Sequence, residues 1–380
     1  LALLPVPEAT ATLLAVFPRM VDATRAVVDL MGSGVVPEAC EIVDRVMLGT
    51  VEEAFRFGFP TDADAVMICE LAGTAGAARE DAERAEQLLR TAGASEVRAA
   101  ADTEERDRLW MCRKKAFGAV GRLAPSYVTM DVVVPLGHLP GLVREIQSIK
   151  DRHEVEVATA FHAGDGNLHP GVHYDDRDPD ETRRAHRAAD EIIRAALERG
   201  GSATGEHGVG IEKRHVLSWQ LDSETARLLH AIKDLFDPGG ILNPGKALAE
   251  PDAACAPSVP VPREIMFRWD DLTVTAPAST RLSDLQAEAM TRGFQVPVGL
   301  ALDQEGPGPT VGGLVDDLVS GPCLGSAGTA RDALLEIWAA TGDGRPFHAG
   351  APVFKNVAGY DLPGLVAGSG GALVSLSAVT

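Results

Sequence analysis

The chain has 380 residues, which is long enough for two domains that each bury a core of their own. Its 35 basic and 55 acidic residues give a formal net charge of -20, which argues against nucleic acid and anionic membrane surfaces as partners. Five cysteines without C-x-x-C spacing predict neither a disulfide framework nor a cysteine-ligated metal, and indicate a reducing cytoplasm.

The sequence pattern predicts neither a transmembrane segment nor a signal peptide. No apolar run approaches the roughly 20 residues that span a bilayer, so we expect no transmembrane segment. The chain begins at Leu1 without an initiator methionine and without the basic start of a signal peptide, and we interpret this start as a truncation.

The first 200 residues alternate between strand and helix patterns. Periods near 2 and near 3.6 follow one another and predict an α+β or α/β domain. We expect strands over residues 10–17, 65–73, 128–135 and 154–162, and helices over residues 18–31, 77–91 and 138–150. A charged helix that opens at Asp178 and runs to about Arg199 completes this part.

A segment rich in alanine and proline, residues 247–267, reads as an extended linker. It predicts a domain of residues 1–246 and a second domain of residues 268–380. Within the second domain we expect a strand over residues 270–280 and a helix capped by Ser283. The remaining residues are rich in glycine, which suits a backbone packed closely on a ligand.

The segment FHAGDGNLHP, residues 161–170, places His162 and His169 on either side of a sharp glycine turn. About forty residues later, GEHGVG adds Glu206 and His207. Two histidines and a glutamate are a common ligand set for zinc, manganese or iron(II), and His207 would then act as a base. The same residues could instead be ordinary turn residues, or the metal site of a hydrolase.

Residues 1–246 resemble the substrate (cap) domain of flavin-linked 2-hydroxy-acid oxidases and dehydrogenases, most closely that of the D subunit of bacterial glycolate oxidase. The resemblance is carried by FHAGDGNLHP, GGSATGEHGVGIEKR, DLFDPGGILNPGK, LWMCRKKAF and MDVVVP. It implies an α+β cap of ferredoxin-like units over a flavin domain of the vanillyl-alcohol oxidase (PCMH) type.

This resemblance also implies roles for individual residues. His162, His169 and Glu206 would bind a divalent metal, and His207 would be the catalytic base. Arg113 would bind the substrate carboxylate, with Asn167 near the substrate. Some relatives place a lysine just before the aspartate of the MDVVVP-like strand, where this chain has Met130.

Residues 268–380 resemble the flavin-binding domain of the E subunit of glycolate oxidase, through TVGGLVDDLVSGP and VFKNVAGYDLPGLVAGSGG. The match lacks the opening part of that domain, and Asp316 and Asp317 stand where the family usually has small residues. The alternative is a set of glycine turns that bind nothing. The resemblance implies FAD contacts at Gly312, Gly313, Lys355, Asn356, Gly359, Tyr360, Asp361, Gly368 and Ser369.

Taken together, these observations predict an FAD-dependent enzyme that oxidises a small 2-hydroxy acid, glycolate or D-lactate. A cap of one subunit type followed by part of another indicates a gene fusion or a fragment of one. The implied partners are other glycolate oxidase-like subunits, including an iron-sulfur subunit, on the inner face of the membrane. The alternative is a non-catalytic assembly subunit without a competent flavin site.

Overall fold

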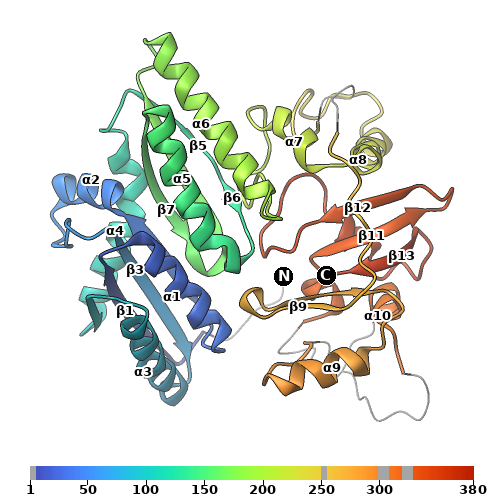
Figure 1. Cartoon of the computed structure of the whole chain (residues 1–380), viewed down its shortest axis with the longest axis horizontal. Coiled ribbons are helices and arrows are strands. Elements are labelled where there is room, and N and C mark those ends of the chain that lie inside the picture. The colour runs from blue at the N-terminus through green and yellow to red at the C-terminus, as the bar shows by residue number, and fades with distance from the viewer. Residues whose placement is uncertain (1–5, 250–254, 298–307, 319–327) are drawn as a thin grey trace. The chain divides into compact units, whose positions relative to one another are not determined.

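The computed structural model of the chain describes residues 6–249, 255–297, 308–318 and 328–380. Cys323 and residues 250–254 of the expected linker lie outside the described residues. The chain divides into two compact units (Figure 1). The first contains residues 1–205 and 269–272, and the second contains residues 206–268 and 273–380.

The first unit is an α+β structure built on one antiparallel sheet. Its strands are β1 (Ala9–Phe17), β2 (Ala39–Asp44), β3 (Ala65–Gly73), β4 (Glu96–Ala99), β5 (Ser126–Thr129), β6 (Val132–Val133), β7 (Glu156–His162) and β8 (Asn167–Tyr174). Its α-helices are α1 (Met20–Gly32), α2 (Arg45–Phe55), α3 (Ala75–Thr91), α4 (Thr103–Val120), α5 (Leu139–His153) and α6 (Pro179–Leu197). Short 3-10 helices are η1 (Leu136–His138), η2 (Ala163–Asp165) and η3 (Trp269–Asp271).

The strand order of this sheet is β4-β1-β3-β2-β7-β8-β5, with β6 paired to β8. Its first four strands have the ferredoxin-like order, and all pairings are antiparallel, which confirms the expected α+β class. The expected strand over residues 128–135 is two short strands, β5 and β6, that both pair with β8.

Helices cover both faces of the sheet. Figure 1 shows α1, α5 and α6 in front of it. On the opposite face α2 and α4 pack on strand side chains that include Leu14, Val43, Ile68 and Ala160. The alternation of side chains along each strand divides the sheet's residues between these two faces.

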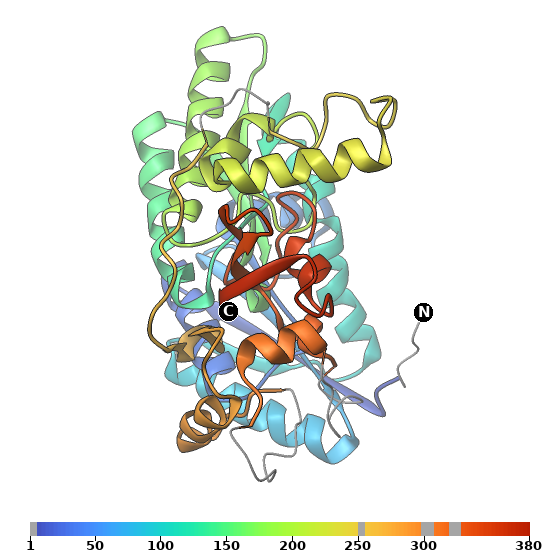
Figure 2. The same cartoon turned by 90° about the vertical axis from the view of Figure 1, so that its right-hand side faces the viewer.

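The second unit has a smaller antiparallel sheet of order β12-β11-β13-β10-β9, drawn in red and orange in Figure 2. Its strands are β9 (Met266–Arg268), β10 (Thr273–Pro277), β11 (Glu336–Thr341), β12 (Pro346–Gly350) and β13 (Val374–Val379). Its helices are α7 (Arg214–Gln220), α8 (Ser223–Phe236), α9 (Leu282–Thr291), α10 (Val311–Asp317), α12 (Ala330–Ala333) and α13 (Leu362–Val366).

The compact units divide earlier in the chain than the linker pattern predicts. Residues after 205 pack on the C-terminal part, because Leu217, Leu229 and Leu248 share one core with Ile337 and Phe347. The described residues of the expected linker, 247–249 and 255–267, thus belong to the second unit.

Helix starts follow local chemistry in most cases. Asp178 caps α6 by accepting from the backbone N–H groups of Asp180 and Glu181, as the sequence predicts. The predicted cap at Ser283 is wrong: the N-cap residue of α9 is Arg281, two residues earlier, and no side chain caps the helix. The Ser283 hydroxyl lies near Asp284 instead. Among the described residues, no helix combines the length and hydrophobicity needed to span a bilayer.

Candidate functional site

The glycine turn of FHAGDGNLHP is a tight hairpin between β7 and β8. His162 ends β7, η2 makes the turn, and Gly166 adopts a φ of +68° before β8 begins. A Cβ atom at Gly166 would lie 2.2 Å from the carbonyl oxygen of Val134, so glycine is required there. The hairpin sets the rings of His162 and His169 perpendicular to one another, with centroids 5.2 Å apart.

A carboxylate on the neighbouring strand holds His162. Glu41 of β2 lies directly opposite His162 in the β2–β7 pairing, so both side chains are on one face of the sheet. Glu41 Oε1 is 2.5 Å from Nδ1 of His162. The Glu41 side chain is only 9% exposed, whereas His162 is 30% exposed.

The second oxygen of Glu41 holds Arg113. Arg113 Nε donates to Glu41 Oε2 at 2.8 Å, and the Arg113 side chain is 11% exposed. The guanidinium carbon lies 5.4 Å from the centre of the Phe117 ring. Arg113 is therefore a buried, oriented group of α4 rather than a surface arginine. Its two terminal amino groups make no hydrogen bond or ion pair to any side chain or backbone that the structure describes.

A second buried carboxylate lies beside His169. Asp131 is fully buried and accepts from Thr204 Oγ1 and Asn167 Nδ2, each at 2.8 Å. Its carboxylate is also 3.7 Å from Nδ1 of His169. Asn167 is fully buried, and within the described residues its Oδ1 has no hydrogen-bond partner.

Met130 and Gly205 flank the motif residues of the first unit in sequence, and both are packed in its interior. Met130 is 1% exposed in the core, at the position where some relatives carry a lysine. Gly205 approaches Asn167 so closely that a Cβ atom would lie 2.7 Å from its Nδ2, and its N–H donates to the backbone oxygen of Asp131. The glycine before the Glu206-His207 pair is thus a packing requirement of this cluster.

Glu206 and His207 open the second unit and are half exposed. Their nearest ring-nitrogen and carboxylate atoms are 3.9 Å apart. Lys355 Nζ donates to Glu206 Oε2 at 2.9 Å. The structure thus pairs two residues that the sequence analysis assigned to different ligands, the metal and the flavin.

Most of the residues expected to contact FAD have structural roles within the second unit. Gly312 donates its N–H to the backbone of Ala278, and Gly313 donates to the cap residue Thr310. Gly359 and Gly368 have positive φ and leave no room for a side chain against Leu229 and Leu318.

Among the remaining residues expected to contact FAD, one has a buried side-chain hydroxyl without a hydrogen bond in the described part of the chain. Asp361 caps α13, and the Asn356 side chain accepts from the N–H of Ala358. Tyr360 is 42% exposed. The Ser369 hydroxyl is buried and makes no hydrogen bond within the described part of the chain. Burial, and then the neighbouring Asp317, raise the pKa of Asp316 above its usual value.

A cavity of about 210 Å³ in the second unit is lined by Asn356, Gly359, Tyr360 and Asp361 among others. Enclosed sites for drug-sized ligands usually measure about 300–1,000 Å³. This cavity would therefore hold only part of a molecule as large as FAD.

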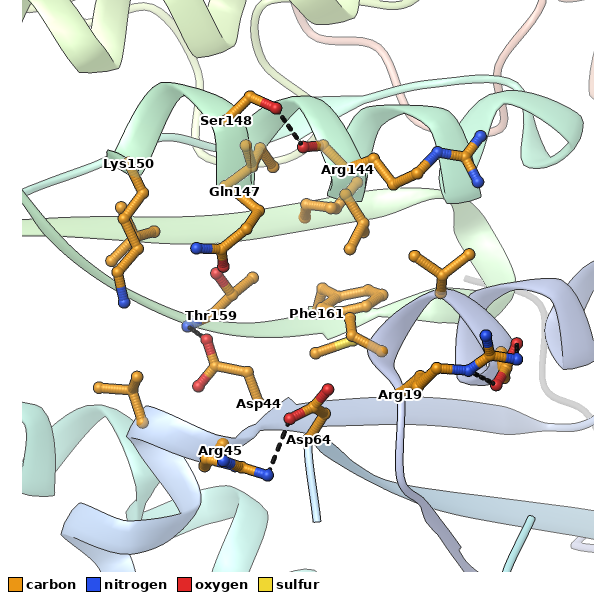
Figure 3. A pocket seen from close by; sticks show the side chains of 18 of the residues that line it. Arg19, Asp44, Arg45, Asp64, Arg144, Gln147, Ser148, Lys150, Thr159 and Phe161 are labelled. Atoms are coloured by element: carbon orange, nitrogen blue, oxygen red, sulfur yellow. Dashed lines mark hydrogen bonds and ion pairs between the residues drawn. The ribbon is translucent and has the colours of Figure 1, made fainter. Parts of the chain in front are cut away.

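A larger cavity, about 800 Å³, lies on the other face of the first sheet, between α1 and α5 (Figure 3). Phe161 and Leu168 line it, and their strand neighbours His162 and His169 consequently point to the opposite face. None of the predicted site residues lines this cavity. Figure 3 shows the Asp64–Arg45 ion pair and the Asp44 carboxylate beside Thr159 at its edge.

Sequence reasoning missed Glu41, and it treated Asp131 only as part of a motif. A usable signal was present in both cases, because each is an acidic residue among apolar neighbours in a strand segment, Glu41 in ACEIV and Asp131 in MDVVVP. A buried carboxylate is costly unless it is paired, so its presence in such a segment points to buried partners.

Comparison with known proteins covers mainly the N-terminal two thirds of the chain. Residues 6–247 match the family described as FAD linked oxidases, C-terminal domain. Glycolate oxidase subunit GlcD of Escherichia coli K12 is 41% identical over 244 residues, which are 64% of this chain and 49% of that protein. The GlcD subunit of Bacillus subtilis is 36% identical, covering 65% of this chain and 53% of its own length.

One further relative and one solved structure extend the comparison. A probable mitochondrial D-lactate dehydrogenase of Danio rerio is 31% identical over 251 residues, covering 65% of this chain and 50% of that protein. A crystal structure of p-cresol methylhydroxylase with substrate bound superposes with a TM-score of 0.52 at 14% identity, covering 66% of this chain and 54% of that one, which is a likeness of fold. The chain spans about half the length of the sequence relatives it matches. Through residues 6–247, the chain belongs to the FAD linked oxidases, as a carrier of their C-terminal domain.

Proposed function

We propose that this chain forms the substrate-binding part of an FAD-dependent oxidase or dehydrogenase that acts on a small 2-hydroxy acid, glycolate or D-lactate. The similarity to glycolate oxidase subunits and to a D-lactate dehydrogenase supports this substrate class. The observation that carries the proposal is the group of Glu41, Arg113 and His162, in which the buried Glu41 carboxylate contacts both a guanidinium and an imidazole.

A 2-hydroxy acid offers two groups that match this arrangement. Its carboxylate would bind the terminal amino groups of Arg113 in a planar fork, while Glu41 fixes the guanidinium through Nε. The Asn167 side chain would lie near the substrate. These contacts would orient the hydroxyl-bearing carbon and exclude water from it.

We further propose that His162, His169 and Glu206 bind zinc, manganese or iron(II). Two imidazoles at this separation, with a carboxylate beside one Nδ1, are a donor pair that suits these ions. A bound divalent ion supplies Lewis acidity that lowers the pKa of the substrate hydroxyl. His207 would take the hydroxyl proton as general base.

FAD is the cofactor that we propose, because a flavin supplies the acceptor for the hydride lost from the substrate carbon. The nine second-unit residues named from the sequence stay proposed contacts, in a partial flavin domain of residues 268–380 that follows a cap of residues 1–246. Because the cavity that four of them line is small, we propose that another subunit completes the flavin site. An iron-sulfur subunit would then receive the electrons, at the inner face of the membrane.

The test is an absorption spectrum of the purified full chain with added FAD, followed by reduction of a dye in the presence of glycolate or D-lactate. We expect a bound flavin band and dye reduction, either with the chain alone or with the co-purified subunits. The variant His207→Ala should retain the wild-type fold and flavin band and lose at least about 100-fold in turnover, as expected for loss of a general base. A chain and complex that bind no flavin would support the alternative, a non-catalytic assembly subunit.

A further inference from the structure

The Glu41 carboxylate is the common partner of two groups to which the proposed function gives different tasks. Its Oε1 contacts the imidazole proposed to bind the metal, and its Oε2 contacts the guanidinium proposed to bind the substrate carboxylate. The carboxylate is almost fully buried, and the direct β2–β7 register fixes its position relative to His162. A single side chain therefore controls the geometry of both groups.

The contact with His162 decides which ring nitrogen carries the proton. An ionised carboxylate only accepts hydrogen bonds, so the Nδ1 facing Glu41 must be protonated. In a neutral imidazole the lone pair then belongs to Nε2, which is the nitrogen that can bind a cation. Carboxylates in this position raise the basicity of the ligating imidazole and hold its ring plane.

The contact with Arg113 decides how the guanidinium faces the site. Because Arg113 Nε donates to Glu41, the two terminal amino groups are left to form the end of the guanidinium fork. That end can donate two parallel hydrogen bonds to a planar carboxylate. The face of the Phe117 ring packs against the guanidinium.

We propose that Glu41 is a positioning residue that couples the two halves of the substrate site, setting the Nδ1–H tautomer of His162 and the orientation of Arg113. The inference rests on the proposed function for the identity of the two ligands. It adds Glu41, a residue that would contact neither the metal nor the substrate.

The chain contains a matched control for this role. Glu70 on β3 is also a buried carboxylate, and it pairs with Arg106, which lies two helical turns before Arg113 on the same helix. Its other partners are Thr12 and Trp110, and among the residues that the structure describes it pairs with no histidine. Glu70→Gln thus removes a similar buried charge pair from the same sheet and helix, without touching the proposed site.

The first experiment titrates the full-length chain with Co²⁺ alone, followed by its visible absorption, and with Zn²⁺ by chelator competition. We expect Glu41→Gln to weaken binding of both ions by about 10- to 100-fold, Glu41→Asp to weaken it less, and Glu70→Gln to leave it unchanged. Equal affinity in wild type and Glu41→Gln, or equal losses in Glu41→Gln and Glu70→Gln, would overturn the positioning role.

The second experiment reads the tautomer without any metal. Imidazole ¹⁵N shifts of the histidine-labelled chain, with His162→Gln for assignment, should show His162 protonated at Nδ1 in wild type and in Glu70→Gln. In Glu41→Ala the proton should redistribute toward Nε2. An unchanged His162 signal in Glu41→Ala would refute the inference, whereas the expected tautomer in a chain that binds neither Co²⁺ nor Zn²⁺ would refute only the proposed metal site.

Discussion

Asp44 is a carboxyl group at the end of β2 that accepts hydrogen bonds from two backbone N–H groups, those of Met47 and Thr159. Burial raises the pKa of Asp44 from 3.8 to about 7, and the two N–H groups oppose this effect without cancelling it. The folded chain consequently binds this proton more tightly than the unfolded chain does.

The free energy of unfolding should therefore fall as the pH rises from about 4 to about 7, because the folded state must give up a proton that it holds more tightly. The contribution of Asp44 is on the order of a few kcal/mol over this window. Asp44→Asn should flatten that slope in urea unfolding curves recorded at several pH values. Thr74→Ala, which removes the N-cap side chain of α3 without removing a titratable group, serves as the control and should keep the wild-type slope. If Asp44→Asn keeps the wild-type slope, the raised pKa of Asp44 is not the cause of this pH dependence.

At the scale of elements, the β7–β8 hairpin depends on one glycine. Gly166→Ala places a side chain at a φ of +68° and 2.2 Å from the Val134 carbonyl oxygen. We expect a loss of about 1–3 kcal/mol in the free energy of unfolding, with displacement of the turn that carries both histidines. Gly118→Ala is the control, since no atom lies within 4 Å of the added Cβ on helix α4. That variant should be neutral or more stable by up to about 1 kcal/mol. Thermal or urea unfolding measures the stability of both variants. Equal stabilities of Gly166→Ala and Gly118→Ala would contradict the requirement for glycine at position 166.

Elements with strong local patterns could be predicted from the sequence, and elements defined by pairing could not. The strand at residues 65–73 and the helix opened by Asp178 have clear periodicity or caps, and the structure confirms both. The continuous strand over residues 128–135 was wrong because Met130 and Asp131 separate two short pieces that pair with β8 at different points. The cap at Ser283 was wrong because the chain enters α9 two residues earlier, at Arg281.

The candidate site shows the same division. His162 and His169 could be found because a short turn brings them together, so their proximity is a local property of the sequence. Glu41 lies 121 residues before His162 and meets it only through the β2–β7 register, which no local pattern specifies. Motifs therefore revealed the residues proposed to touch ligands, and the fold was needed to reveal the residue that orients them.

At the scale of the whole molecule, the match to the FAD linked oxidase domain and the packing of the chain end at different places. The family match continues to residue 247, whereas residues from 206 onward pack in the second unit. Val209, Leu217 and Leu229 lie in one core with Ile337 and Leu362. A sequence domain that ends at residue 247 would consequently leave the apolar face of α8 without its partner strands.

A fragment of residues 1–247 should therefore be cleaved by proteases within residues 206–247 much faster than the full chain. The physical reason is that Leu229, 2% exposed in the full chain, loses the β11 and β12 side chains that bury it. Limited proteolysis with mass spectrometry should show a product ending near residue 205 from the fragment only. Leu229→Ala in the full chain tests the same contact by substitution, and we expect it to lower stability by about 2–5 kcal/mol and to expose the same cleavage region. If the fragment and the full chain are equally resistant in this region, residues 206–247 fold without the C-terminal part and the two-unit division fails.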